Sequence, residues 1–218
     1  MRYVRHLIIG ALLMRRGYRI VSLGQAATGC SWKFCPDGLN AESVVYSGGV
    51  GKDITFEHAL VRDFGCMVNL VDPSPTGLTT MALPQNKIPQ FRFSPVALAG
   101  RCGTLRFAPP ISDDEGSWFS TRQTSDGIEV PCLDLASLLK QNQHQRVDLL
   151  KLDIEGAEYE VLDNILDTGL PVRQILVEFH DGLLPGIRLH QTVRAMFRLA
   201  THGYKLIAEL GTTYAFIR

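Results

Sequence analysis

The sequence predicts an α/β fold in which helices cover both faces of a mostly parallel sheet. From Ser43 onward, short apolar runs rich in β-branched residues alternate with stretches that have the period of a helix, which is the pattern of a doubly wound sheet. The length of 218 residues suits one domain with a full core. Hydrophobic residues make up 45% and charged residues 20%, a balance that argues against disorder and against a membrane bundle.

The first half of the chain contains three expected strands and one expected helix. Apolar runs predict strands over 43–46, 67–71 and 92–98, and a helix is expected over 54–64. The turn between the first strand and that helix reads SGGVGKD. Pro73 and Pro75 end the second strand, because proline lacks the amide hydrogen that a sheet needs. Residues 100–130 have scattered Gly, Pro and Ser without a helical period, so we expect a hairpin or a covering insertion there.

The second half repeats the alternation. Helices are expected over 133–139, 155–166 and 189–201, and strands over 147–152, 175–179, 204–208 and 213–217. The run VDLLKL at 147–152 is nearly continuous in apolar residues, which is typical of a central parallel strand.

Residues 1–29 form an N-terminal segment that we expect to be helical or to serve in targeting, and the main domain then spans 30–218. Arg2 and Arg5 precede the apolar run LIIGALLM, as at the start of a signal peptide. The run is shorter than the roughly 20 residues that span a bilayer. Arginines follow it, so an amphipathic or packing helix is favoured over a cleaved signal or a surface anchor. We therefore do not expect membrane association, although the run leaves a surface anchor open.

Charge and cysteine content narrow the partners and the compartment. Lys plus Arg and Asp plus Glu both total 22, so no global positive field would attract a nucleic acid. The five cysteines are odd in number and irregularly spaced, which fits neither a disulfide framework nor a four-ligand zinc site. We expect a cytoplasmic protein without a nucleic-acid partner.

The candidate ligand site lies at the carboxyl ends of the strands, where open parallel sheets bind ligands. Gly48, Gly49 and Gly51 allow the backbone to turn sharply there and to approach a ligand closely. Asp72 follows the next strand, a position from which a carboxylate can accept hydrogen bonds from both ribose hydroxyls. Together these residues indicate an adenosine-type ligand, which is a nicotinamide dinucleotide, a nucleoside triphosphate or S-adenosylmethionine.

The details of the turn favour the third of these ligands. A phosphate loop would need Gly at position 46 and Ser or Thr at position 53, where the chain has Tyr46 and Asp53. Dinucleotide binding would need a glycine at position 54, which is Ile54. Asp53 would repel phosphates, whereas the sulfonium and ammonium groups of S-adenosylmethionine tolerate a nearby acid.

The chain resembles the FkbM-like S-adenosylmethionine-dependent methyltransferases over 30–218. The likeness is carried by VVYSGGVGKDITFE (44–57), NLVDPSPTG (69–77), VDLLKLDIEGAEYEVL (147–162) and QILVEFH (174–180), of which LKLDIEGAE is the most specific. The resemblance implies a three-layer Rossmann-like class I methyltransferase fold, with a seven-stranded sheet whose last strand is antiparallel. It also implies methylation of a hydroxyl oxygen on a small molecule of sugar, lipid or polyketide type.

The same resemblance assigns the residues that bind the cofactor. Ser47, Gly49, Gly51 and Asp53 match the family's acidic-x-Gly-x-Gly-x-Gly turn, and Asp72 matches its ribose acid. Because Ser47 replaces the usual acid and Asp53 the usual last glycine, the match supports the adenosine half of the cofactor more fully than the methionine half. The complete expected set is Ser47, Gly48, Gly49, Gly51, Asp53, Asp72, Ala97, Leu98 and Asp153, with Ala97 and Leu98 against the adenine.

Three side chains at the same edge of the sheet are candidates for catalysis. A hydroxyl acceptor must lose a proton, and Asp153, Glu155 and His180 follow strands whose carboxyl ends meet there. His180 has the ordinary pKa nearest to neutrality. Structural alternatives are a helix cap for Asp153, a helix-dipole partner for Glu155 and a turn residue for His180. The three could instead hold a divalent cation that acidifies the acceptor, but we expect no resident metal.

Two other functions stay open. The departures at Ser47 and Asp53 suit a binding or regulatory module that keeps the cofactor pocket without turnover, and a nucleotide-binding protein is less favoured. For the enzyme we expect a small-molecule acceptor, under a roof formed by the 100–130 insertion and its Trp118. Glu178 is expected to orient His180 or to line the cleft.

Overall fold

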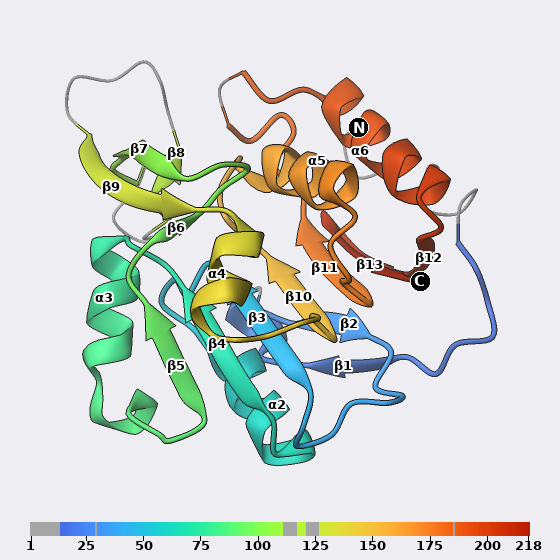
Figure 1. Ribbon diagram of the computed structural model, residues 1–218, viewed down its shortest axis with the longest axis horizontal. Helices are drawn as coiled ribbons and strands as arrows, with labels where there is room; N and C mark the ends of the chain where they lie inside the picture. Colours follow the sequence, from blue (N-terminus) through green and yellow to red (C-terminus); the bar gives the residue numbers. More distant parts are fainter. Residues whose placement is uncertain (1–13, 29, 111–116, 121–126, 185) are drawn as a thin grey trace.

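The computed structural model describes residues 14–28, 30–110, 117–120, 127–184 and 186–218, and a seven-stranded sheet runs through its centre (Figure 1). The strands are β3 (Val44–Gly48), β4 (Met67–Val71), β5 (Phe91–Ser94), β10 (Leu149–Leu152), β11 (Gln174–Glu178), β12 (Lys205–Leu210) and β13 (Thr213–Ile217). Their order across the sheet is β12-β13-β11-β10-β3-β4-β5. The five strands from β11 to β5 are parallel, and β13 is antiparallel to both neighbours. The expected sheet, with its antiparallel last strand, is confirmed.

Two layers cover the sheet. The helices α4 (Leu135–Gln141), α5 (Glu158–Thr168) and α6 (Leu189–Thr201) lie on one face, in front of the sheet in Figure 1. The helix α2 (Thr55–Phe64) and a two-stranded sheet, β1 (Val21–Leu23) with β2 (Trp32–Phe34), cover the other face. Successive strand residues point to opposite faces, so Tyr46 packs in the first core and Val45 in the second.

The β1–β2 pair packs on the second face beside α2. Trp32 and Phe34 are buried, and their rings lie 6.2 and 5.9 Å from that of Phe56 on α2. This pairing joins residues on either side of the expected division at 29–30. The N-terminal helix was expected over the apolar run at 7–14. Residues 7–13 lie outside the described part of the chain, and Met14 forms a β-bridge with Leu206. In the ranges that the structure describes, no helix is long and apolar enough to span a bilayer.

The strands that the structure describes within 100–130 belong to a second, four-stranded sheet of order β6-β9-β7-β8. Its strands are β6 (Ala97–Leu98), β7 (Gly103–Ala108), β8 (Phe119–Ser120) and β9 (Ile128–Leu133). The antiparallel pair of β7 and β9 is the expected hairpin. The expected strand at 92–98 is wrong in its extent, because β5 ends at Ser94. Beyond Pro95, Ala97 and Leu98 pair with β9 instead. A proline cannot continue the ladder.

The helices expected over 54–64 and 133–139 differ from α2 and α4 by one or two residues at their ends, and two other departures are larger. The helix expected from 155 begins at Glu158, because Glu155 and Gly156 have left-handed φ angles of 52° and 101° that no α-helix contains. The chain also forms α3 (Pro75–Ala82), where no helix was expected. Ser74 accepts a hydrogen bond from the amide of Gly77 at 3.0 Å, and Pro75 is the first helical residue. Two short 3-10 helices, η1 (Ala26–Thr28) and η2 (Pro84–Asn86), complete the described elements.

Candidate active site

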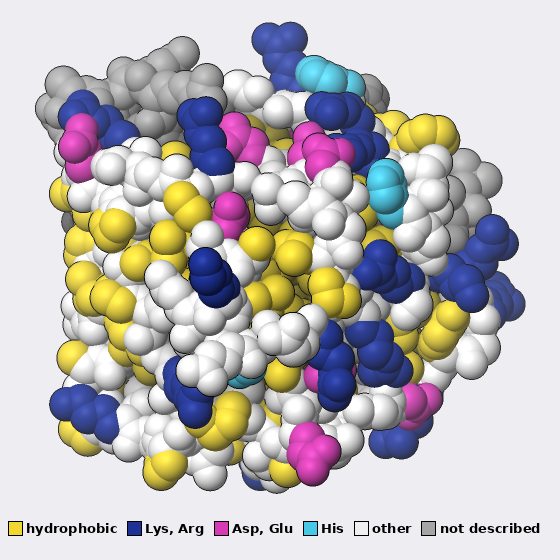
Figure 2. Space-filling view, viewed as in Figure 1, with side chains coloured by type: hydrophobic (Ala, Val, Ile, Leu, Met, Phe, Trp, Pro, Cys, Tyr) yellow, Lys and Arg dark blue, Asp and Glu magenta, His cyan; other side chains and the backbone are white. Residues whose placement is uncertain are grey.

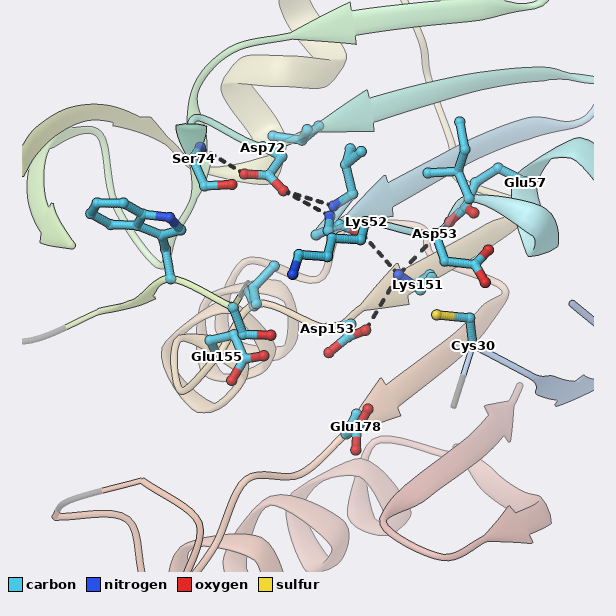
Figure 3. Close-up of a pocket in the computed structure, with 18 of the residues that line it drawn as sticks. Cys30, Lys52, Asp53, Glu57, Asp72, Ser74, Lys151, Asp153, Glu155 and Glu178 are labelled. Atoms are coloured by element: carbon cyan, nitrogen blue, oxygen red, sulfur yellow. Dashed lines mark hydrogen bonds and ion pairs between the residues drawn. The ribbon is translucent and has the colours of Figure 1, made fainter. Parts of the chain in front are cut away.

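A cavity of about 1030 Å³ opens at the carboxyl ends of β3, β4, β10 and β11. It lies where the strand order reverses between β3 and β10, the usual place for a ligand in an open α/β sheet. The expected residues that line it are Gly49, Gly51, Asp53, Asp72, Ala97, Leu98, Asp153, Glu155, Glu178 and His180. Ser47 and Gly48 do not reach its wall. Most of the expected site residues therefore meet in one place (Figure 3).

The glycine turn is held by the strands on either side. The amide of Gly49 donates to the carbonyl oxygen of Val71 at 3.0 Å, and Lys151 Nζ donates to the carbonyl oxygen of Gly49 at 2.9 Å. Gly49 has a φ of 85°, and a Cβ there would lie 1.8 Å from the carbonyl oxygen of Asp153. Only glycine fits at this position, so the turn lies directly against the end of β10.

Asp72 is buried and ties the turn to the start of α3. Its Oδ2 accepts hydrogen bonds from the amides of Val50 at 2.9 Å and Gly51 at 3.2 Å, and its Oδ1 accepts one from the amide of Ser74 at 2.7 Å (Figure 3). The carboxylate still lines the cavity. Sequence reasoning expected Asp72 at the ligand site but missed that three backbone amides already use its carboxylate.

Beneath the turn lies a buried ion-pair network that sequence reasoning missed. Lys151 Nζ lies 3.7 Å from Glu57 Oε1 and 3.6 Å from Asp153 Oδ2, and its ammonium is 5.1 Å from the centre of the Trp32 ring. Ser47 Oγ donates to Glu57 Oε1 at 2.6 Å. Burial would lower the pKa of Lys151, but Asp153 and Glu57 outweigh it and raise the pKa. In the sequence, the sign of this network was a lysine within an apolar strand, which needs a buried partner of opposite charge.

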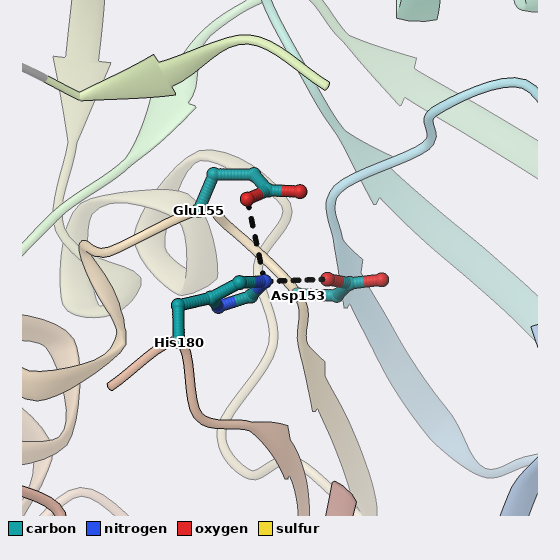
Figure 4. Close-up of side chains that lie close together, drawn as sticks. All are labelled: Asp153, Glu155 and His180. Atoms are coloured by element: carbon teal, nitrogen blue, oxygen red, sulfur yellow. Dashed lines mark ion pairs between the residues drawn. The ribbon is translucent and has the colours of Figure 1, made fainter. Parts of the chain in front are cut away.

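His180 lies among three carboxylates. Its Nε2 is 3.3 Å from Glu155 Oε2 and 3.9 Å from Asp153 Oδ1 (Figure 4), and its Nδ1 is 3.0 Å from Glu158 Oε1. Glu158 is fully buried and accepts hydrogen bonds from the amides of Ile154 and Gly156. The amides hold the carboxylate of Glu158 against Nδ1, while Nε2 on the other side of the ring faces Asp153 and Glu155.

Burial and neighbouring charge shift the pKa values of this cluster. Burial raises the pKa of Glu155 to about 7, and burial together with Asp153 raises the pKa of Glu178. Burial alone would lower the pKa of His180, but Glu158, Glu155 and Asp153 outweigh it and hold the pKa well above its ordinary value. Asp153 does not cap α5, whose N-cap residue is Ala157. The inner end of the cavity therefore has more acidic than basic groups.

The outer part of the cavity is apolar. Phe107 on β7 and Trp118, which precedes β8, line it together with Leu183 and Leu184 from the loop after β11. The expectation that Trp118 helps to roof an acceptor stays a prediction. Figure 2 shows Lys and Arg side chains spread over the displayed face among neutral and acidic ones, with the densest group toward its right edge.

Comparison with known proteins identifies a matching family and a curated relative. Residues 40–206 match the family model described as methyltransferase FkbM domain. The probable methyltransferase-like protein 24 of Rattus norvegicus is 27% identical over 168 residues, which cover 76% of this chain and 39% of that protein. The chain therefore spans about two fifths of the length of this curated relative.

Two solved structures match this chain at low similarity. A Methanococcus jannaschii fibrillarin pre-rRNA processing protein is 10% identical with a TM-score of 0.44, over 82% of this chain and 67% of that chain. The M. jannaschii TYW2 in complex with AdoMet is 11% identical with a TM-score of 0.35, over 94% and 86%. Likeness at this level carries no argument about function.

Proposed function

The chain belongs to the FkbM methyltransferase family, and on that premise we propose that it transfers the methyl group of S-adenosylmethionine to a hydroxyl oxygen of a small molecule of sugar, lipid or polyketide type. The observation that carries the proposal is the cavity, which has the glycine turn and Asp72 on one side and Asp153, Glu155 and His180 on the other. A cofactor on the first group would present its methyl to an acceptor beside the second.

The adenosine half of the cofactor would lie along the turn. Ala97 and Leu98 line the cavity and offer an apolar surface for adenine. A carboxylate has about four lone-pair positions, and three backbone amides already use Asp72. We therefore propose that Asp72 accepts a hydrogen bond from one ribose hydroxyl rather than from two, so the other hydroxyl needs a different partner.

The methionine half would lie over the acidic inner end. Glu57, Asp153, Glu155 and Glu178 face the cavity there, and a sulfonium cation beside them gains favourable electrostatic energy. An anionic phosphate in the same place would be repelled. Asp53 also lines the cavity, which supports the same preference for a cationic ligand.

Methyl transfer would be an in-line displacement. The acceptor oxygen forms a bond to the methyl carbon while the bond from that carbon to sulfur breaks, and the electron pair of that bond stays on sulfur. Alignment of the three atoms is the largest contribution the protein can make. The acceptor hydroxyl also loses its proton, and we propose that Asp153, Glu155 and His180 act on that proton, a contribution of about 10²–10⁴-fold.

A binding module without turnover is the second candidate. One observation favours it: Ser47, which replaces the usual acid, donates its hydroxyl to Glu57 and does not reach the cavity wall. Two results together would favour the binding module. The chain would bind S-adenosylhomocysteine, and it would transfer no methyl group from labelled S-adenosylmethionine to a panel of sugars and lipids.

Calorimetric titration of the chain with S-adenosylhomocysteine tests the cofactor. We expect saturable binding, and Asp72→Asn should weaken it about 10- to 100-fold, the worth of one charged hydrogen bond. Asp63→Asn on the exposed face of α2 is the matched control and should bind as the parent does. Thermal melts check that Asp72→Asn stays folded. Tight binding of ATP or NAD alongside no binding of S-adenosylhomocysteine would overturn the assignment.

A further inference from the structure

We propose that Asp153, Glu155 and His180 together bind one divalent cation, such as Mn²⁺, at the inner end of the cavity. The three come from the segments that follow β10 and β11, and each offers one ligand atom to a common point. The chemical role given to the cation rests on the proposed function. Its binding is independent of the cofactor and is tested without it.

The distances suit a single ion. The three ligand atoms lie within 4.8 Å of one another, with His180 Nε2 at 3.3 Å from Glu155 Oε2 and 3.9 Å from Asp153 Oδ1 (Figure 4). Ligand bonds to such ions are about 2.0–2.3 Å long, so neighbouring ligand atoms around one ion stand about 3 Å apart. The side chains need only small movements to meet the same ion.

A separate observation is the way His180 is held. Metal-binding histidines commonly place their other ring nitrogen against a carboxylate, which fixes the ring and makes it a better ligand. Glu158 does this for His180, with Oε1 at 3.0 Å from Nδ1. Glu158 has no exposed surface and is itself fixed by the amides of Ile154 and Gly156. The ring therefore lies with Nδ1 against Glu158 and with Nε2 facing Asp153 and Glu155.

The surrounding charge favours a cation. Glu57, Asp153, Glu155, Glu158 and Glu178 lie at or beneath this end of the cavity, whereas Lys151 and His180 are the basic groups among them. Lys151 is already paired with both Glu57 and Asp153. A divalent ion would offset part of the remaining negative charge.

A bound cation would have a chemical use. Three protein ligands leave coordination positions open toward the cavity, as in catalytic metal sites. An acceptor hydroxyl in one of them would have a lowered pKa and would give up its proton to solvent water more readily. Asp153, Glu155 and His180 would then act as ligands rather than as bases, which replaces the expectation of no resident metal.

Titration of the chain with Mn²⁺ after removal of metals with EDTA tests the site. The electron paramagnetic resonance signal of free Mn²⁺ should fall until one ion per chain is bound. Asp153→Asn, Glu155→Gln and His180→Gln should each weaken binding at least about tenfold, and Glu158→Gln about 10- to 100-fold. Glu160→Gln and His190→Gln are the matched controls, because they change an exposed glutamate and an exposed histidine. Both variants should bind Mn²⁺ as the parent chain does.

Pulsed electron paramagnetic resonance supplies a readout that loss of folding cannot imitate. Mn²⁺ bound to the parent chain should show coupling to a ligand nitrogen, which disappears in His180→Gln and persists in His190→Gln. Absence of saturable binding, absence of nitrogen coupling in the parent, or equal affinity in the ligand variants would overturn the proposal. In that last case the three residues form only an ion-pair cluster.

The outcome for the cation is distinguishable from the outcome for the cofactor. A chain that binds S-adenosylhomocysteine but not Mn²⁺ overturns the cation alone. A chain that binds Mn²⁺ at these residues but not S-adenosylhomocysteine overturns the proposed function alone.

Discussion

Replacing Lys151 with Met tests whether the network beneath the glycine turn supports the site. Lys151 is 6% exposed, and its ammonium lies 3.7 Å from the carboxylate of Glu57, which is 1% exposed. Methionine keeps the apolar stem but removes the charge, which leaves Glu57 buried without a cation and the carbonyl oxygen of Gly49 without its donor. Breaking a buried ion pair on one side costs about 3–5 kcal/mol. At about 2–4 °C per kcal/mol, Tm should fall by about 6–20 °C.

Urea denaturation followed by tryptophan fluorescence measures the free energy of unfolding. The double variant Glu57→Gln/Lys151→Met removes the uncompensated charge and should recover about 1 kcal/mol or more relative to Lys151→Met. Lys140→Met, at an exposed position of α4, should stay within about 0.5 kcal/mol of the parent chain. A cost below about 1 kcal/mol for Lys151→Met, or a double variant no more stable than the single one, would refute the reasoning.

Four further substitutions probe the fold. Gly49→Ala should prevent stable folding in thermal melts, because its Cβ would lie 1.8 Å from the Asp153 carbonyl oxygen, whereas Gly51→Ala meets open space and should cost about 1–2 kcal/mol for its positive φ. Burial lowers the pKa of His144, so the unfolded chain binds its proton more readily. The free energy of unfolding should therefore fall as pH drops below about 6.5, and His144→Gln should flatten this dependence in urea titrations. Asp134→Ala removes the N-cap of α4 and should lower that energy by about 1 kcal/mol in the same assay.

The sheet could be predicted because its inner strands are buried on both faces. Such strands appear as short apolar runs regardless of what packs on them, so 67–71 and 213–217 match β4 and β13 residue for residue. The position of the site followed from the same reasoning, since the carboxyl ends of parallel strands meet at one edge. Asp153, Glu155 and His180 were placed together on this ground alone.

The features that could not be predicted depend on contacts between distant segments. Trp32, Lys33 and Phe34 form a strand only because α2 and the sheet bury the two aromatic rings, and three residues are too few to show a period. A carboxylate at a strand end looks the same in sequence whether it accepts from a ligand or, like Asp72, from backbone amides. Lys151 sits within an apolar run, and its partner Glu57 lies on another element. Neither residue predicts the other.

The position of β13 has a consequence for synthesis of the chain. β13 is the last strand in chain order, yet it lies between β11 and β12. While a nascent chain still lacks Thr213–Ile217, β11 has an unpaired edge beside the segment that leads to His180. Unpaired edges invite association with other chains. The interval before that strand leaves the ribosome is therefore when this protein would most need a chaperone.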